Sequence, residues 1–120
     1  MADKFELGNP EQVEYKAFAR RFDGAGDDGK GTEDVLCVMA TLTYPRAGWR
    51  VLLTPQEGED ATWRLLAEEP AYGEDVRTYY TTSASTRRAP DAVPPSVRVI
   101  DGRGTQTVPV EPWGGAATER

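Results

Sequence analysis

The sequence predicts an all-β fold, an antiparallel immunoglobulin-like sandwich of about seven strands. Short runs rich in Val, Leu, Thr and Tyr recur about every 8–12 residues, and each is bounded by Gly, Pro or Asp. The strand–helix–strand alternation that is typical of parallel sheets does not appear. A chain of 120 residues is close to the usual size of one domain, so we expect a single core over residues 1–120, with frayed ends at 1–8 and 114–120.

The N-terminal part is predicted to form a short helix ahead of the strands. Asn9 suits an N-cap, and Pro10 suits the first helical position. In a helix, Tyr15, Phe18 and Phe22 would share one face, whereas in a strand Tyr15 would face away from the two phenylalanines. The capping residues favour the helix.

The strongest strand signal is Asp34–Tyr44 (DVLCVMATLTY), where both faces are largely apolar at the start. Such a pattern is typical of a central strand. Pro45–Gly48 has the composition of a turn, and Trp49–Thr54 has that of a strand. We therefore predict a β-hairpin that joins Asp34–Tyr44 to Trp49–Thr54 through this turn.

Further along, the chain alternates between strands and turns. Thr62–Glu68 is a short strand or helix between turn signals, and Asp75–Ser83 is a strand rich in Thr and Tyr. Ser85–Pro95 is punctuated by proline and is predicted to be a long connection. A second hairpin is predicted to join Val97–Ile100 to Thr105–Val110 around an Asp-Gly turn.

Two stretches, Tyr44–Leu53 (YPRAGWRVLL) and Leu65–Pro70 (LLAEEP), resemble small bacterial β-sandwich proteins of unassigned role. In those proteins a Gly-Trp step opens a strand that continues into Val and Leu. The resemblance covers roughly residues 40–110. It implies a bacterial protein with an immunoglobulin-like sandwich, and it implies no activity. The Cys…Trp…Cys spacing of antibody domains is missing from the sequence.

The composition excludes several functional classes. Histidine is absent, which removes Ser-His-Asp and Cys-His catalysis and His-ligated zinc. Cys37 is the one cysteine, so no internal disulfide can form, and its place in the most apolar strand predicts a buried side chain. The carboxylate pairs Glu68-Glu69 and Glu74-Asp75 are predicted to be solvated turn residues and not catalytic dyads, because adjacent strand residues face opposite sides. We therefore expect no enzyme, no cofactor and no metal centre.

Charge and hydropathy restrict the partners. With 28% charged residues and a mean hydropathy of -0.60, the chain is not an integral membrane protein. The N-terminus lacks the apolar segment of a secretory signal, so we expect a cytoplasmic protein that binds no membrane. The net charge of -6 argues against binding to nucleic acid. The acidity is uneven, because residues 1–75 hold 16 acidic and 8 basic side chains, against 4 and 6 in residues 76–120.

The acidic, glycine-rich segment Gly24–Asp34 is predicted to be a solvated loop. Gly24–Lys30 has the spacing of a P-loop core, but Gly31 replaces the Ser or Thr that would hold magnesium. A set of carboxylates in the same region could bind calcium weakly, although their spacing breaks the EF-hand pattern: Asp23, Asp27, Asp28, Glu33 and Asp34. Calcium binding by the loop at 23–34 is left open.

The candidate site residues are Trp49, Trp63, Tyr79 and Tyr80. Neighbouring strand residues face opposite sides, so one of Tyr79 and Tyr80 should point outward. Beside Trp49 or Trp63, an outward tyrosine would form an aromatic platform for a sugar or a peptide. The alternative is that the tryptophans, Trp113 included, only build the core.

These features predict a non-catalytic interaction module that binds a protein partner, or its own copy, through sheet edges or an aromatic patch. The first alternative is a carbohydrate- or small-ligand-binding domain that uses exposed Trp and Tyr. The second is an acidic inhibitor that mimics nucleic acid, because the first 75 residues carry most of the negative charge.

Overall fold

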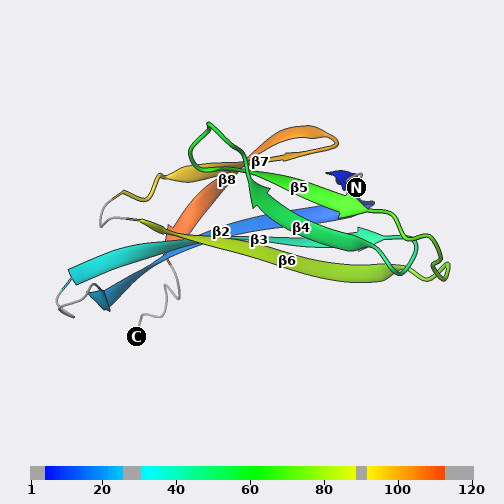
Figure 1. Cartoon of the computed structure of the whole chain (residues 1–120), viewed down its shortest axis with the longest axis horizontal. Coiled ribbons are helices and arrows are strands. Elements are labelled where there is room, and N and C mark those ends of the chain that lie inside the picture. The colour runs from blue at the N-terminus through cyan, green and yellow to red at the C-terminus, as the bar shows by residue number, and fades with distance from the viewer. Residues whose placement is uncertain (1–4, 26–30, 89–91, 113–120) are drawn as a thin grey trace.

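The computed structural model describes residues 5–25, 31–88 and 92–112, and every regular element in them is a β-strand (Figure 1). The prediction of an all-β fold is confirmed. No helix that is long and apolar enough to cross a membrane occurs in these three stretches. In chain order the strands are β1 (Glu6–Leu7), β2 (Gln12–Ala25), β3 (Gly31–Tyr44), β4 (Arg50–Pro55), β5 (Thr62–Glu68), β6 (Thr78–Arg88), β7 (Ser96–Asp101) and β8 (Gly104–Pro112).

The strands form one mixed sheet in the order β1-β5-β7-β8-β2-β3-β6, and β4 pairs with β5 beside this path. Most neighbours are antiparallel, but β2–β8 and β5–β7 are parallel. The sheet curls into a half-barrel (Figure 1). The prediction of a wholly antiparallel sheet is therefore wrong, and the arrangement is not clearly an immunoglobulin-like sandwich.

The N-terminal helix predicted from the capping residues is wrong, because residues 12–25 form the strand β2. β2 pairs with β3 over almost the whole length of both strands. This ladder provides hydrogen-bond partners for both backbones and outweighs a local capping preference. Pro10 is fully buried, and the amide of Glu11 donates to the carbonyl of Thr43, so the expected cap instead leads the chain into β2.

The predicted hairpin between β3 and β4 is also wrong, because β4 pairs with β5 and β6 takes the place beside β3. Pro45–Gly48 is instead a crossover between the two ends of the sheet, and Gly48 has a φ of 96°, a left-handed conformation that favours glycine. The second predicted hairpin is confirmed. β7 and β8 pair up to Asp101↔Gly104, where the chain turns.

The core lies on the inner, concave face of the half-barrel. β3 lies between β2 and β6, as predicted for the central strand, and every second residue from Leu36 to Tyr44 is buried. The buried carboxylate of Asp101 accepts hydrogen bonds from the Tyr15 hydroxyl at 2.6 Å and from the Arg103 amide at 2.8 Å. The buried apolar residues are Ala17, Leu36, Val38, Ala40, Leu42, Tyr44, Leu53, Trp63, Leu65, Ala67, Val97, Val99 and Val108.

Candidate functional site

One edge of the sheet is free along an entire strand. β6 has 11 residues and pairs with β3 from Tyr44↔Thr78 to Asp34↔Arg88. No other strand in the described part of the chain pairs with its second side (Figure 1). In an antiparallel ladder, alternate residues direct their N–H and C=O groups away from the partner strand. The free edge of β6 therefore presents a row of unpaired backbone donors and acceptors.

β6 lacks the features that usually protect such an edge. Thr78–Thr86 contains no charged residue and no proline, and its pairing with β3 has no bulge. The outer face of β6 is exposed at every second residue, and none of its side chains is fully buried. The opposite edge strand, β4, has 6 residues and ends at Pro55, a short, proline-ended form that limits further pairing.

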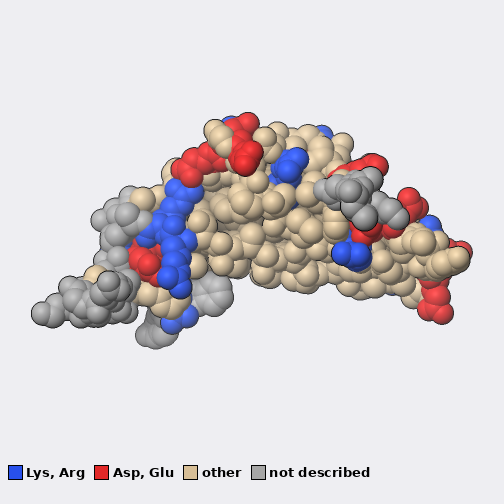
Figure 2. Space-filling view, viewed as in Figure 1, with Lys and Arg blue, Asp and Glu red and all other residues tan. Residues whose placement is uncertain are grey.

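The C-terminal end of β6 is tied to the turn between β4 and β5. The guanidinium of Arg88 binds the carboxylate of Asp60 twice, with Nη2–Oδ1 at 2.5 Å and Nη1–Oδ2 at 3.0 Å. The bonds from Arg88 lower the pKa of Asp60. Figure 2 shows basic and acidic side chains meeting at this end of the molecule.

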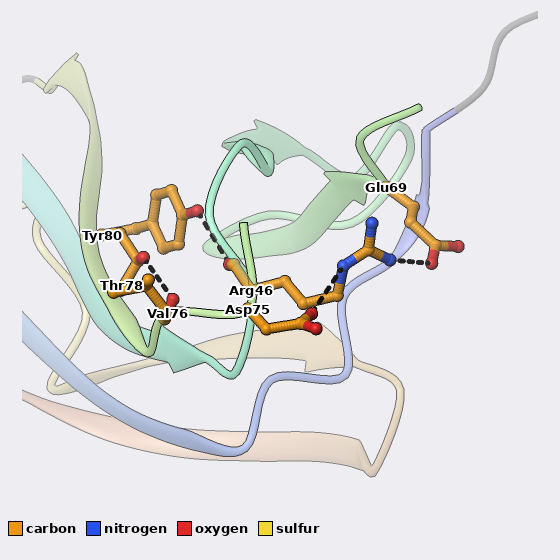
Figure 3. Close-up of polar contacts among 6 residues, drawn as sticks. All are labelled: Arg46, Glu69, Asp75, Val76, Thr78 and Tyr80. Carbon is orange, nitrogen blue, oxygen red and sulfur yellow. Dashed lines mark hydrogen bonds and ion pairs between the residues drawn. The ribbon is translucent and has the colours of Figure 1, made fainter. Parts of the chain in front are cut away.

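Tyr80 ties the other half of β6 to the crossover between β3 and β4 (Figure 3). Its hydroxyl accepts a hydrogen bond from the Trp49 amide at 3.1 Å and donates one to the Arg46 carbonyl at 3.3 Å. The guanidinium of Arg46 in turn reaches the carboxylates of Glu69 at 3.4 Å and Asp75 at 3.8 Å. Contacts at both ends therefore hold β6 beside β4, although the two strands form no ladder.

The structure brings two of the four predicted site residues together and separates the others. Tyr79 is 72% exposed on the outer face, whereas Tyr80 packs against the core, so the prediction that they point in opposite directions is confirmed. Trp49 is half-buried and stacks on Tyr44, with ring centroids 3.9 Å apart, and Tyr44 also makes an edge contact with Tyr80. Trp63 is 4% exposed and belongs to the core. These residues therefore do not form one exposed platform.

A cavity of about 220 Å³ lies beside the Tyr44–Trp49 stack. Tyr44 Oη and Trp49 Nε1 are buried and have no hydrogen-bond partner within the described residues. Burial raises the pKa of the Tyr44 hydroxyl, and an interaction with the backbone of Asn9 opposes this rise. The rest of the wall consists of Glu6, Leu7, Gly8, Asn9, Ala67 and Glu69. No sequence pattern indicates this cavity, because Tyr44 simply continues the apolar alternation of β3.

Among the described residues, acidic side chains lie beside basic ones in several parts of the fold. Figure 2 shows both signs of charge at several places on the face that it presents. Many described carboxylates form ion pairs with arginines of other segments, and these pairs include Glu11–Arg77, Asp34–Arg21, Asp60–Arg88, Glu68–Arg50 and Glu69–Arg46. This distribution offers little support for the alternative of an acidic nucleic-acid mimic.

Part of the segment predicted to be an acidic loop is strand, because β2 extends to Ala25 and β3 begins at Gly31. Residues 26–30, which hold most of the P-loop-like spacing and two of the proposed calcium ligands, lie outside the described residues. Asp34 accepts two hydrogen bonds from Arg21, at 2.8 Å and 3.2 Å, so this carboxylate is already paired. Among the described residues, no group of three or more Asp, Glu, Cys or His side chains could hold a metal ion. Trp113 also lies outside the described residues.

Cys37 is half-buried on the outer face of β3, where the prediction placed it in a fully buried position. Burial raises the pKa of its thiol, which lowers the thiolate fraction at neutral pH. Its residual exposure follows from the fold, because β3 is central within the sheet while its outer side chains face away from the core.

No protein-family model matches the chain, and no curated protein and no solved structure matches it either. The free edge of β6 and the cavity beside Tyr44 are the two candidate sites of the described structure.

Proposed function

We propose that the chain is a non-catalytic interaction module that binds an extended polypeptide segment by strand addition at the free edge of β6. The observation that carries this proposal is an edge strand of 11 residues with a partner on one side only. Backbone hydrogen bonds supply affinity in this mode of recognition, and the side chains on either side of the added strand supply specificity. The absence of histidine from the sequence favours binding over catalysis.

The side chains of β6 suit this role. On the outer face, Thr81, Ser83 and Ser85 are small, polar and exposed, so a neighbouring strand can approach without a steric clash. Tyr79 is exposed at one end of this row and offers a ring against which a partner side chain can pack. Tyr80 and Arg88 anchor the strand from its inner face, and neither contact pairs the backbone of β6 with another strand.

Proline substitutions at two neighbouring positions test this proposal. Thr82 pairs with Ala40 and Ser83 pairs with Met39, so one of the two directs its N–H group toward β3 and the other directs it outward. Proline at the inward position breaks the sheet and lowers stability, whereas proline at the outward position removes only a free donor. Urea unfolding identifies the inward position as the one where proline causes the larger loss of stability. Thr82→Ala and Ser83→Ala control for the lost side chains.

The binding readout uses the outward proline variant. Wild-type protein and the two alanine variants should capture the same polypeptide from a bacterial lysate, and the outward proline variant should not. Hydrogen exchange on the purified complex should show protection that is concentrated in residues 78–88. Equal capture by the outward proline variant, or protection confined to other strands, would contradict strand addition at β6.

A second candidate function is the binding of a small polar ligand, such as a sugar, in the cavity beside Tyr44. The unpartnered Tyr44 hydroxyl and Trp49 indole N–H favour it, because both are groups that a hydroxylated ligand could satisfy. A panel of sugars should quench or shift tryptophan fluorescence in the wild-type protein. The response should weaken in Tyr44→Phe, and no response from any sugar would remove this candidate.

A further inference from the structure

We infer that the free edge of β6 pairs with β6 of a second copy of this chain, antiparallel and about a two-fold axis near Ser83. The inference rests on the proposed use of the β6 edge and identifies its occupant. A two-fold axis brings the same surface of both copies together, so every exposed donor on one edge faces an acceptor on the other. β6 is an unbulged strand of 11 residues with Ser83 at its centre, which suits such pairing.

The charges along β6 select the antiparallel orientation. Glu74 and Asp75 are exposed just before the strand, together with Arg77, which pairs with Glu11, whereas Arg87 is exposed near the end of the strand. Figure 2 shows a largely uncharged surface between two ends that each carry both basic and acidic side chains. Antiparallel pairing brings the acidic end of one copy toward the basic end of the other. Parallel pairing would bring like charges together.

The charged side chains at the two ends remain available to a partner. The side chain of Arg87 is 81% exposed and lies 3.5 Å from Glu33, and the side chain of Asp75 is 92% exposed and lies 3.8 Å from Arg46. Ion pairs as exposed as these contribute little, so their exchange for contacts across a dimer costs little. Arg88, in contrast, is held by Asp60 and stays on the inner face.

Tyr79 gives the pairing its register. Tyr79 and Arg87 lie on the same outer face, equally far from Ser83 along the strand. A two-fold axis at Ser83 therefore places Tyr79 of each copy directly beside Arg87 of the other. A guanidinium beside a tyrosine ring gains cation–π attraction, and this contact covers a ring that is 72% exposed in the single chain.

The pairing would join the two copies into one continuous sheet. In each copy the outer face of β2–β3–β6 carries half-buried Phe18, Val35 and Met39. Small Thr and Ser side chains line the proposed seam on this face, so the two sheets can meet without a bulky obstruction. The free edge, which would otherwise favour open-ended aggregation, is then closed by a symmetric contact.

Disulfide trapping tests the register directly. In a Cys37→Ser background, Ser83→Cys places two thiols on residues that face each other across the axis, at Cα separations compatible with a disulfide. Mild oxidation should give a covalent dimer. Thr107→Cys in the same background is the matched control, because Thr107 is exposed on β8, away from the free edge. It should stay monomeric on the same time scale.

Sedimentation velocity measures the unlinked protein. The wild-type chain should show a concentration-dependent monomer–dimer equilibrium. Arg87→Glu and Tyr79→Ser should each weaken it about tenfold, because each removes the same contact twice in a symmetric dimer. The combination of Asp75→Arg and Arg87→Glu in one chain should recover part of the loss, because it reverses the charge at both ends.

Three outcomes would overturn the inference: a wild-type chain that is monomeric throughout, a dimer unaffected by the outward proline variant, or equal crosslinking of Ser83→Cys and Thr107→Cys. These outcomes are separable from failure of the proposed function. A monomeric protein that still captures a polypeptide through β6 refutes the dimer and keeps strand addition. A dimer that is lost in the outward proline variant supports both.

Discussion

At the residue scale, two buried polar side chains of the inner face differ in their hydrogen bonding. The carboxylate of Asp101 is fully paired, through Tyr15 at 2.6 Å and the Arg103 amide at 2.8 Å. The hydroxyl of Tyr44, on a residue that is 3% exposed, has no partner within the described structure. A buried polar group without a partner costs about 1–3 kcal/mol. The Tyr44 hydroxyl therefore lowers stability, whereas the Tyr15 hydroxyl raises it.

Tyr44→Phe should raise the free energy of unfolding by about 1 kcal/mol, because it removes the unpaired hydroxyl and keeps the ring stacked on Trp49. Tyr15→Phe is the matched control and should lower the free energy of unfolding by about 1–2 kcal/mol, because it breaks a bond to a charged acceptor. Urea denaturation at neutral pH measures both. A stability loss in Tyr44→Phe comparable to that in Tyr15→Phe would show that the Tyr44 hydroxyl is paired after all.

Tyr15 should also make stability fall in alkaline solution. Burial, followed by the bond to Asp101, raises the pKa of Tyr15 well above its usual value of 10.0. The unfolded chain therefore loses the Tyr15 proton above about pH 10 while the folded chain keeps it. As a result, the free energy of unfolding falls by about 1.4 kcal/mol per pH unit. Urea unfolding at pH 9, 10 and 11 should show a steeper decline for wild type than for Tyr15→Phe. Parallel declines would contradict the assignment.

At the scale of the element, local pattern predicted β3, β4 and the β7–β8 hairpin, and it left β5 open between a strand and a helix. The alternation in Asp34–Tyr44 reports burial directly, because each second residue faces the core. The helix predicted from Asn9 and Pro10 was wrong, because their capping preference stabilises the chain less than the ladder that β2 forms with β3. The prediction of a β3–β4 hairpin was also wrong because of pairing with a distant strand. β6, which is distant in sequence, occupies the edge of β3 that β4 was expected to take.

The candidate site was predictable only in part. Strand geometry predicted that Tyr79 and Tyr80 face opposite sides. The fate of Trp63 depended on which face of β5 meets the core, and the segment Thr62–Glu68 was too short to decide this from its pattern. The free edge of β6 could not be predicted from the sequence, because an edge is defined by strand order and not by the composition of one strand.

The turn between β4 and β5 offers a prediction at this same scale. Ala61 has a φ of 53°, a left-handed conformation that is strained for a residue with a Cβ atom. Ala61→Gly should therefore raise the free energy of unfolding by about 0.5–1 kcal/mol, the relieved strain exceeding the entropy added to the unfolded chain. Gly58 lies in the same turn with a φ of 80° and open space around it, so Gly58→Ala should lower stability by about 1 kcal/mol. Thermal unfolding followed by circular dichroism measures both, and a shift of the same sign in both variants would contradict the strain argument.

At the scale of the whole molecule, the two outer strands of the half-barrel, β4 and β6, form no ladder with each other. β4 and β6 lie at opposite ends of the sheet and are held together by side chains. Tyr80 joins them near the crossover, and Arg88 joins β6 to Asp60 beyond the far end of β4. The two ties differ in environment. Tyr80 packs against the core, whereas the carboxylate of Asp60 is exposed.

This difference predicts that the Tyr80 hydrogen bonds stabilise the half-barrel more than the Arg88–Asp60 ion pair does. Tyr80→Phe should lower the free energy of unfolding by about 1–2 kcal/mol, because the Trp49 amide and the Arg46 carbonyl both lose a partner at a half-buried site. Asp60→Asn should change it by less than about 0.5 kcal/mol, since solvent screens an exposed ion pair, and the small effect should vanish in high salt. Urea denaturation at low and high ionic strength separates the two. If Asp60→Asn proved the more damaging, closure would depend on charge at the open end of β6, and the strand that we propose as the docking edge would loosen as salt rises.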